Sequence, residues 1–481
     1  MATVRKHPPK TTVKIKTQKP ESVAATAKVQ TVEFHAREEP IAAGRLLRNK
    51  VSRSSHAGWT ASASRRDPID ILEETNQGRD PERVPIRYGR MLRNPSTFLR
   101  GSAGLMAYDL AATPNTGIQV QACGDCHLLN FGLFATPERN LVFDIIDFDE
   151  TLPAPWEWDI KRLAASFAVA ARDERLSDDD AQVAAAGCAR AYRENVRKYS
   201  KMNSMENSDH RLDSDSLIAM APNGKTKKRR ERLVEKAHHL IGDSPFPKIA
   251  APTDGRHRLL DRPPILFHAQ GEEFEKRFRE EIEVYRQTLS DEMRVLFDRY
   301  RLEDYAVTVA GIGSVGTRSA IGLFFSAESP ALLLEFKDAC PSVLEPYAGK
   351  SRYDNHAQRV VMGQRLMQSY SDIFLGWGRP ANGRDFFVRQ LHDKKLSAPL
   401  EGATVQQFKL YAELCGSTLA RAHARSGDAS TISGYLGKTD KFDRAIGEFS
   451  LAYADQTRRD HAALVKAVNS GRIKTIIEED E

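Results

Sequence analysis

Apolar residues recur at helical spacing in several long parts of the chain. This pattern predicts helices within residues 67–112, 267–301, 354–372 and 405–426. The stretch 267–301 is also densely charged. Much of the chain is therefore expected to be helical.

Between two of these stretches the apolar period changes to that of strands. Residues 305–311, 317–325 and 331–337 are predicted to form three strands, with glycines at the first junction and SAESP as the second turn. Another strand is predicted at 385–391. Earlier in the chain, FGLF and LVFDIID are joined by ATPERN and predict a β-hairpin within residues 131–147. The fold class is therefore expected to be α+β.

The beginning of the chain has a different composition. Residues 1–70 are rich in Lys, Arg, Ser, Thr, Ala and Pro with little apolar periodicity, which predicts a disordered basic tail. No apolar run there or later has the length of a secretory signal or a membrane span. The five cysteines are scattered, as in proteins that keep reduced thiols. A cytoplasmic location without a membrane partner is expected.

The net charge of +6 is unevenly distributed along the chain. Part of the excess lies in the tail, and part lies in a basic run at the start of a helix-like stretch. We interpret this run as a helix face exposed to solvent. A nucleic-acid partner is unlikely on this pattern, since no aromatic interleaving or zinc-finger spacing accompanies the charges. The oligomeric state is not predicted. The basic run consists of Lys225, Lys227, Lys228, Arg229, Arg230 and Arg232.

Pro- and Gly-rich breaks occur at PNGKTKKRR and at SPFPKIAAPTDGRHRLLDRPP. Together with the change of period, they suggest four parts after the basic tail. The parts are a large segment with an acidic loop and helices, a small β-rich segment, further helices and a terminal tail, at residues 71–300, 301–398, 399–465 and 466–481.

The stretch CGDCHLLNFG allows more than one chemistry. Cys123-Gly-Asp-Cys126-His127 fits the CxxCH pattern of covalent haem attachment, and the cysteine pair resembles half of a zinc site. Haem attachment requires export, which nothing in the sequence indicates, and the zinc pattern lacks its second pair. We expect both cysteines to pack beside a loop.

The same stretch begins an acidic loop. Asp125 and Asn130 have the DxxxxN spacing of phosphoryl-transfer loops, and the predicted hairpin would carry Asn130 and Asp147 to neighbouring strand ends. Carboxylate and amide oxygens suit Mg²⁺ with nucleotide phosphates. Asp149 and Glu150 add negative charge that a cation would offset. The alternative is that these residues are turn caps and helix caps.

GDCHLLN, IIDFDE and WDIKRLAAS resemble, in order and spacing, the motifs of aminoglycoside-phosphotransferase-like kinases of the protein-kinase-like fold. This resemblance implies that Asp125 is the catalytic base, that Asn130 and Asp147 bind Mg²⁺, with Asp149 as a further candidate, and that Asp159 anchors the loop. The sequence departs from the pattern at Cys123, where a histidine is usual, and at Asp149, where glycine is usual.

A glycine-rich stretch, Gly311-Ile-Gly313-Ser314-Val-Gly316, lies between the first two strands of the small segment. Because a strand follows it, the stretch resembles a kinase phosphate-binding loop more than a dinucleotide-binding one. Lys337 on the third strand would then contact the phosphates of ATP. A tight hairpin and an edge-strand lysine are the alternatives.

Two features depart from an ordinary kinase. The glycine stretch follows the acidic loop, and the expected glutamate partner for the lysine is missing from the helix 354–370. We expect circular permutation of a bilobal fold and assign Glu345 as the substitute partner.

The chain also resembles an uncharacterised bacterial family called domain of unknown function 2252, over about residues 70–460, through RNPSTFLRG, GIGSVGTR, FKDACPSVLEPY and LARAHARSGD. The expected function is an ATP- and Mg²⁺-dependent phosphotransferase acting on an unidentified small-molecule or protein hydroxyl. The alternatives are a nucleotide-binding pseudokinase and an AMP transferase.

Overall fold

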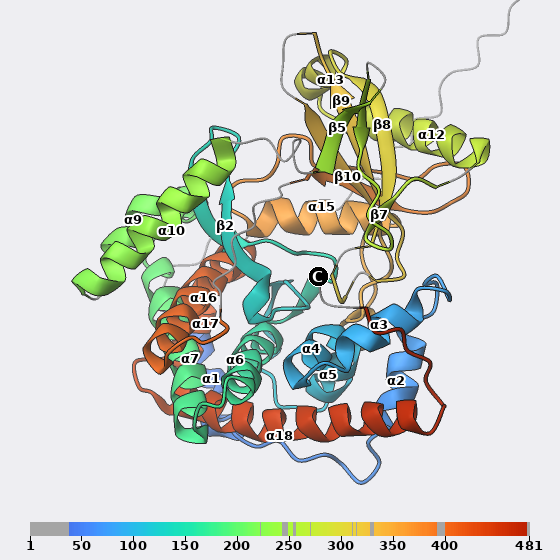
Figure 1. Ribbon diagram of the computed structural model, residues 1–481. Helices are drawn as coiled ribbons and strands as arrows, with labels where there is room; N and C mark the ends of the chain where they lie inside the picture. The colour runs from blue at the N-terminus through green and yellow to red at the C-terminus, as the bar shows by residue number, and fades with distance from the viewer. Residues whose placement is uncertain are drawn as a thin grey trace, which may run out of the picture. The chain divides into compact units, whose positions relative to one another are not determined.

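The computed structural model describes residues 38–221, 223–242, 249–253, 256–269, 271–309, 311–313, 315–327, 331–391 and 400–478 (Figure 1). Helices and strands are both present, which confirms the α+β class. The helices are α1 Glu38–Leu47, α2 Pro68–Glu74, α3 Val84–Met91, α4 Pro95–Gly101, α5 Ala103–Ala111, α6 Trp156–Asp173, α7 Asp178–Tyr199, α8 Ser204–Asp209, α9 Ser214–Ala219, α10 Gly224–Gly242, α12 Glu272–Thr288, α13 Asp291–Phe297, α14 Glu345–Ala348, α15 His356–Met367, α16 Val405–Ser426, α17 Ala429–Leu436 and α18 Lys441–Asn469. The strands are β1 Gln119–Ala122, β2 Phe131–Ala135, β3 Leu141–Ile145, β4 Leu152–Pro155, β5 Ala250–Thr253, β6 Arg256–Leu259, β7 Leu266–Phe267, β8 Arg301–Thr308, β9 Ser319–Phe325, β10 Leu332–Asp338, β11 Gly376–Gly378 and β12 Phe386–Gln390.

A six-stranded antiparallel sheet has the strand order β11-β12-β10-β9-β8-β7. It contains all four strands predicted for this part of the chain, although β8 begins earlier than expected, at Arg301. Helices α12 and α13 cover the sheet through a cluster of aromatic side chains. The two helices before the boundary expected at residue 301 therefore pack on the sheet that follows it. The cluster includes Phe278, Tyr285, Phe297, Phe324 and Phe336.

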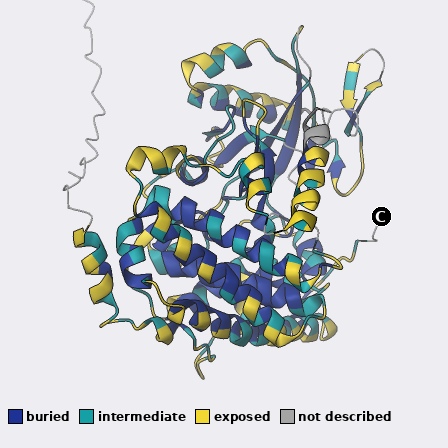
Figure 2. Ribbon diagram, turned by 90° about the vertical axis from the view of Figure 1, so that its left-hand side faces the viewer, coloured by how far each residue is buried: buried dark blue, intermediate teal, exposed yellow. Residues whose placement is uncertain are grey.

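The larger core lies among the long helices α6, α7, α16 and α18 (Figures 1 and 2). Almost every residue of α6 is buried. The α7 and α16 backbones approach so closely that a Cβ at Gly416 would lie 2.2 Å from the carbonyl oxygen of Cys188. Trp156 stacks on Tyr192 with ring centroids 5.5 Å apart. The helices thus form a packed support on which the loops at their ends are fixed.

Two short antiparallel pairs position the acidic loop beside this core. β2 pairs with β3, so that Phe131 lies opposite Ile145, and this confirms the predicted hairpin. β1 pairs with β4, so that Ala122 lies opposite Leu152. Residues 123–130 and 146–151 are therefore brought together at adjacent strand ends.

The part of the expected basic tail from residue 38 to residue 70 is ordered, which corrects the prediction. Helix α1 packs on α17, where a Cβ at Gly44 would lie 2.0 Å from the carbonyl oxygen of Thr431. Arg48 donates to the carbonyl oxygen of Tyr435 at 2.7 Å, and His56 is fully buried. These contacts join residues almost 400 positions apart, so they leave no local periodicity. Residues 1–37 lie outside the described residues.

The expected C-terminal tail, 466–481, is also partly structured. Helix α18 continues to Asn469, and Ile473 is buried beyond it. The side chains of Arg90 and Glu478 form a bidentate ion pair at 2.6 and 2.8 Å. The described end of the chain is therefore attached to α3.

Within the described residues, no helix has the combination of length and apolar composition that membrane crossing requires.

Candidate functional site

Asp159 fixes the start of the acidic loop from the first turn of α6. Its buried carboxylate accepts hydrogen bonds from the backbone N–H of Cys123 at 2.6 Å and of Gly124 at 3.0 Å. His423 Nε2 lies 3.1 Å from the same carboxylate. Gly124 has φ +85°, and a Cβ there would lie 2.4 Å from the carbonyl oxygen of Glu150. The loop is thus held in the conformation that presents Asp125, as expected of an anchoring aspartate.

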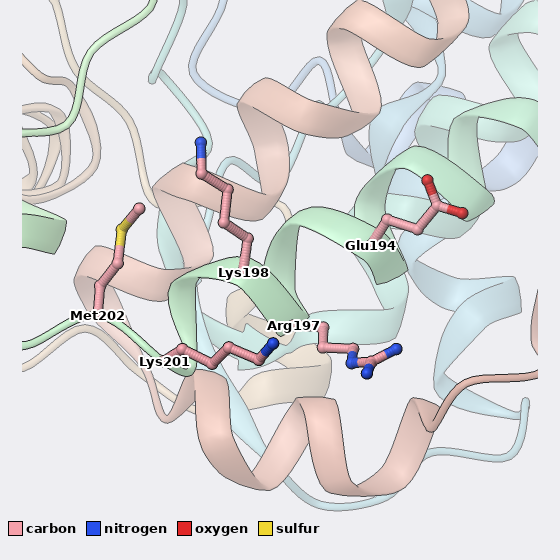
Figure 3. A pocket seen from close by; sticks show the side chains of 5 residues that line it. All are labelled: Glu194, Arg197, Lys198, Lys201 and Met202. Atoms are coloured by element: carbon pink, nitrogen blue, oxygen red, sulfur yellow. The ribbon is translucent and has the colours of Figure 1, made fainter.

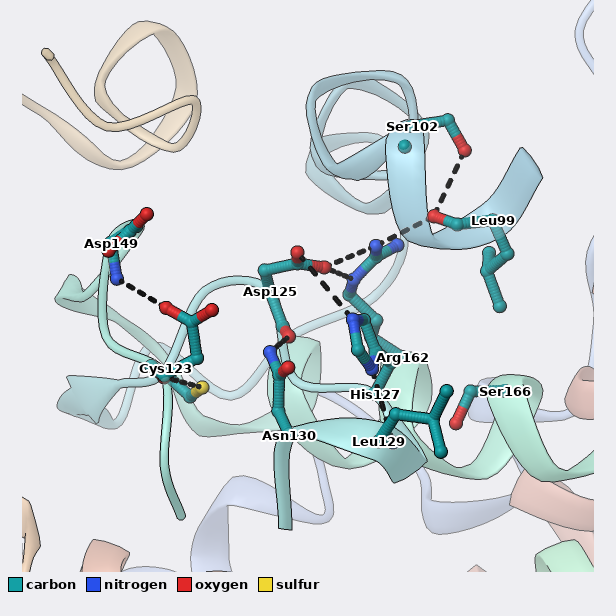
Figure 4. A network of polar contacts seen from close by, with 12 residues as sticks. Leu99, Ser102, Cys123, Asp125, His127, Leu129, Asn130, Asp149, Arg162 and Ser166 are labelled. Carbon is teal, nitrogen blue, oxygen red and sulfur yellow. Dashed lines mark hydrogen bonds and ion pairs between the residues drawn. The ribbon is translucent and has the colours of Figure 1, made fainter. Parts of the chain in front are cut away.

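Asp125 is oriented through one of its two carboxylate oxygens (Figure 4). Oδ1 accepts from Arg162 Nε at 2.8 Å and from Arg162 Nη2 at 2.5 Å. Oδ2 lies 3.9 Å from His127 Nε2, and no described residue donates a hydrogen bond to it. Arg162 also donates to the carbonyl oxygen of Leu99 at 2.9 Å, which ties the arrangement to α4. One carboxylate oxygen is therefore fixed by the protein, and the other can meet a ligand.

Asn130 joins the two halves of the acidic loop. Its side-chain nitrogen donates to the carbonyl oxygen of Asp125 at 2.6 Å, and its own carbonyl accepts from the N–H of Ile146 at 2.9 Å. Asp147 follows directly, and its Oδ1 accepts from the N–H of Asp149 at 3.3 Å. The structure therefore brings Asp125, Asn130, Asp147 and Asp149 into one loop cluster.

Lys337 reaches this cluster from the sheet. Its buried ammonium group forms an ion pair with Asp149, which is 188 positions earlier in the chain. Burial alone would lower the pKa of Lys337, but the carboxylates of Asp149 and Asp147 raise it. Arg389 on the adjacent strand donates to Glu335 at 2.7 Å, and the charges of the same two carboxylates act on it. The sheet thus presents two cations to the acidic loop.

The two carboxylate oxygens of Asp149 differ in their contacts. Oδ2 pairs with Lys337, whereas Oδ1 is buried and accepts a hydrogen bond from none of the described residues. Burial and the neighbouring carboxylate of Asp147 raise the pKa of Asp149. A buried acceptor of this kind is costly unless something binds it. The chemistry of the group fits a hard cation.

No group of three or more His, Cys, Asp or Glu side chains is arranged as a metal site in the described part of the chain. The candidate set consists of two carboxylates and one amide, Asp147, Asp149 and Asn130. Mg²⁺ usually takes only one or two carboxylates and completes its coordination with water and phosphate oxygens. The set therefore suits Mg²⁺ that arrives with a nucleotide better than a metal bound by protein alone.

The glycine stretch lies against the acidic loop. A Cβ at Gly313 would be 4.0 Å from Asp125 Oδ2. Gly311 and Gly316 have φ +68° and +89°, a region that favours glycine. Ser314, which we expected to contact the nucleotide, lies outside the described residues. Gly313 is therefore close enough to the loop to share one site with it.

Residues 79–90, which include most of α3, donate hydrogen bonds to the backbone of this glycine stretch. Arg90 donates to the carbonyl oxygen of Gly311 at 2.7 Å, and Arg79 donates to that of Val315 at 2.7 Å. The backbone N–H of Asp80 donates to the carbonyl oxygen of Gly316 at 2.8 Å. Sequence reasoning missed Arg79 and Arg90, because nothing local links them to residues more than 200 positions later.

The assignment of Glu345 as the partner of Lys337 requires correction. Among the described residues, Lys337 pairs with Asp149, and Glu345 lies 3.7 Å from His356. In place of a glutamate, α15 directs Arg359 towards the acidic loop. This buried arginine donates to the carbonyl oxygens of Thr151 and Asp149, at 2.6 and 2.8 Å. It holds the backbone beside Asp149 rather than the lysine.

The sequence analysis also assigned no role to Arg162. It follows Asp159 by three positions on α6, so the two side chains share one face of the helix and contact the loop together. That spacing in WDIKR was visible in the sequence.

Cys123 and Cys126 are buried in the main core, which confirms the packing interpretation. Burial raises the pKa of both thiols, to about 11 for Cys123. A separate hollow of about 460 Å³ lies at the end of α7 (Figure 3). It contains none of the predicted site residues, and its lining consists of Glu194, Arg197, Lys198, Lys201 and Met202.

Residues 79–467 match the protein family described as "Uncharacterized protein conserved in bacteria (DUF2252)". No curated protein and no solved structure matched the chain. Because the match covers most of the sequence, the chain belongs to this bacterial family.

Proposed function

We propose that this protein is an ATP- and Mg²⁺-dependent phosphotransferase with a bilobal, kinase-like fold in circularly permuted order. Its acceptor would be a hydroxyl group of a small molecule or a protein. The observation that carries the proposal is the ion pair between Lys337 and Asp149. It joins a lysine downstream of a glycine turn to an acidic loop with DxxxxN spacing.

The order of elements in the sheet supports this proposal. The glycine stretch connects the first two long strands, β8 and β9, and Lys337 lies on the third, β10. Helix α15 follows, and it contacts β11 and β12 as well as α16 and β1. A glycine loop, a lysine on the third strand and a following helix are the parts of a kinase small lobe. Here they come after the acidic loop in the chain, as permutation would require.

The charges of the site fit a polyanionic nucleotide with a divalent cation. Asp147, Asp149 and Asn130 would hold Mg²⁺, which neutralises charge on phosphate oxygens. Lys337 would exchange its contact with Asp149 for phosphate oxygens, and Asp149 Oδ1 would gain the partner it lacks. This accounts for a buried acceptor that is otherwise unfavourable.

Asp125 would act on the acceptor. Arg162 fixes its Oδ1, so Oδ2 can accept a hydrogen bond from the acceptor hydroxyl and orient it. As the new oxygen–phosphorus bond forms, the bond from phosphorus to the leaving nucleotide breaks and the hydroxyl proton passes to Asp125. This assigns Asp125 to the transfer step and Lys337 to nucleotide binding.

The experiment is a thermal shift with Mg²⁺-ATP on the full chain. Binding to the folded state stabilises it by about 2.7 kcal/mol at a hundredfold excess over the dissociation constant. We expect Lys337→Met and Asp147→Asn to lose most of this stabilisation. Lys350→Met and Asp354→Asn are matched controls, because both residues are exposed and away from the acidic loop.

The proposed site is wrong if both site variants remain folded and keep the full Mg²⁺-ATP shift. ATP labelled at the γ or the α phosphate then separates the candidate reactions. Transfer of the γ label supports the phosphotransferase, transfer of the α label supports an AMP transferase, and binding without transfer supports a pseudokinase.

A further inference from the structure

Arg100 lies next to the candidate site, and the proposed reaction gives this arginine no role. It lies in the last turn of α4, in the sequence FLRG, and its side chain is half-buried. Nε is buried without a hydrogen-bond partner, and no described residue accepts a hydrogen bond or forms an ion pair with the guanidinium. Only Nε is buried in this way, and an unpartnered buried donor is unfavourable, so a ligand that accepts a hydrogen bond from Nε would stabilise the side chain.

The position of Arg100 relates it to Asp125. Its neighbour Leu99 accepts the hydrogen bond from Arg162, and Arg162 in turn holds Asp125 Oδ1 (Figure 4). Burial lowers the pKa of Arg100, whereas the carboxylates of Asp125 and Asp147 oppose that effect. The charges of both carboxylates therefore act on Arg100, although neither accepts a hydrogen bond from it in the described part of the chain.

Charge balance alone does not explain this arginine. Asp125 already has a two-nitrogen contact with Arg162, and Lys337 pairs with Asp149, two positions after Asp147. A further cation that merely neutralised these carboxylates would be expected to contact one of them. Its guanidinium is better explained by an anion that comes with a ligand.

The two ends of the site differ in the cations they offer. Lys337 pairs with Asp149, whereas the carboxylates of Asp125 and Asp147 act on Arg100. The nucleotide phosphates belong at the Lys337 end, where the lysine pairs with Asp149. The acceptor belongs at the Asp125 end, where Arg100 lies.

We infer that Arg100 binds a phosphate or carboxylate group of the acceptor, so that the substrate is an anionic hydroxyl compound. This inference rests on the proposed function only in identifying the ligand as the acceptor of the reaction. The anion site itself can be tested without nucleotide. Arginine suits the role because its planar fork binds either oxyanion through two hydrogen bonds.

The test is titration of the full chain with inorganic phosphate, and separately with succinate, followed by calorimetry. We expect Arg100→Gln to weaken binding by about tenfold or more, as the loss of a charge-assisted contact implies. Arg100→Lys keeps the charge without the fork and should lie between wild type and Arg100→Gln. Arg93→Gln, an exposed arginine in the preceding turn, is the control and should bind as wild type. Whichever of the two probes depends on Arg100 identifies the type of oxyanion.

A second variant separates this inference from the proposed function. Arginine-dependent phosphate binding should persist in Lys337→Met, and Arg100→Gln should retain the Mg²⁺-ATP thermal shift. The inference is overturned if neither probe binds, if Arg100→Gln binds both probes like the wild type, or if Arg100→Gln loses the Mg²⁺-ATP shift. Should the wild type bind phosphate through Arg100 but show no Mg²⁺-ATP shift, the phosphotransferase is refuted and the anion site stands.

Discussion

Asp159→Asn tests whether the acidic loop depends on its buried anchor. The wild-type carboxylate receives the backbone N–H of Cys123 on one oxygen and that of Gly124 on the other, at 2.6 and 3.0 Å. Asparagine has the same shape but only one oxygen. One of the two N–H groups would therefore face an NH₂ donor inside the core, where Asp159 is 1% exposed.

The size of the effect follows from these contacts. A hydrogen bond to a charged group contributes about 1.5–3 kcal/mol, and an unpaired buried donor costs a similar amount. We therefore expect Asp159→Asn to lower the free energy of unfolding by about 2–3 kcal/mol. Asp159→Ala removes both acceptors, so about twice that loss is expected.

Urea unfolding followed by tryptophan fluorescence measures this loss, since Trp156 and Trp158 lie in the same turn of α6 as Asp159. Asp455→Asn on α18 is the matched control, because its half-exposed carboxylate only pairs with Arg172 near the surface, and a change within about 1 kcal/mol is expected there. The anchoring argument fails if Asp159→Asn unfolds at the same urea concentration as this control.

Two further outcomes concern neighbouring residues of the loop. Asp125→Asn should keep the Mg²⁺-ATP thermal shift but lower any ATP turnover by roughly 10²-fold or more, because a general base acts on the transfer step; unchanged turnover would make Asp125 a structural turn residue. Burial lowers the pKa of His127 to about 4, below its ordinary 6.5, despite the opposing charge of Asp125. The unfolded state then binds the proton more tightly, so stability is complete above pH 6.5 and falls by about 3 kcal/mol as the pH drops to 4. In His127→Asn this part of the pH dependence should disappear from unfolding curves measured between pH 4 and 7, and its persistence would contradict the assignment to His127.

The sequence by itself determined the elements whose pattern is local. Four of the six strands of the sheet and the hairpin carrying Asn130 were predicted from alternation and turn residues, and helix α16 from its apolar spacing. Such patterns arise because a side chain's direction repeats every two residues in a strand and every 3.6 in a helix. The residues that make up the acidic loop were also visible, since they are close together in the chain.

Only the tertiary structure decided which distant residues meet. It paired Lys337 with Asp149 instead of Glu345, placed Arg359 against the acidic loop, and ordered α1 by packing it on α17. None of these contacts produces a periodic pattern in the sequence. Each depends on how whole helices and strands pack and on which charged side chains are buried together. An ion pair across 188 positions is fixed by the packing of the sheet on the helices, and the residues near either partner do not specify it.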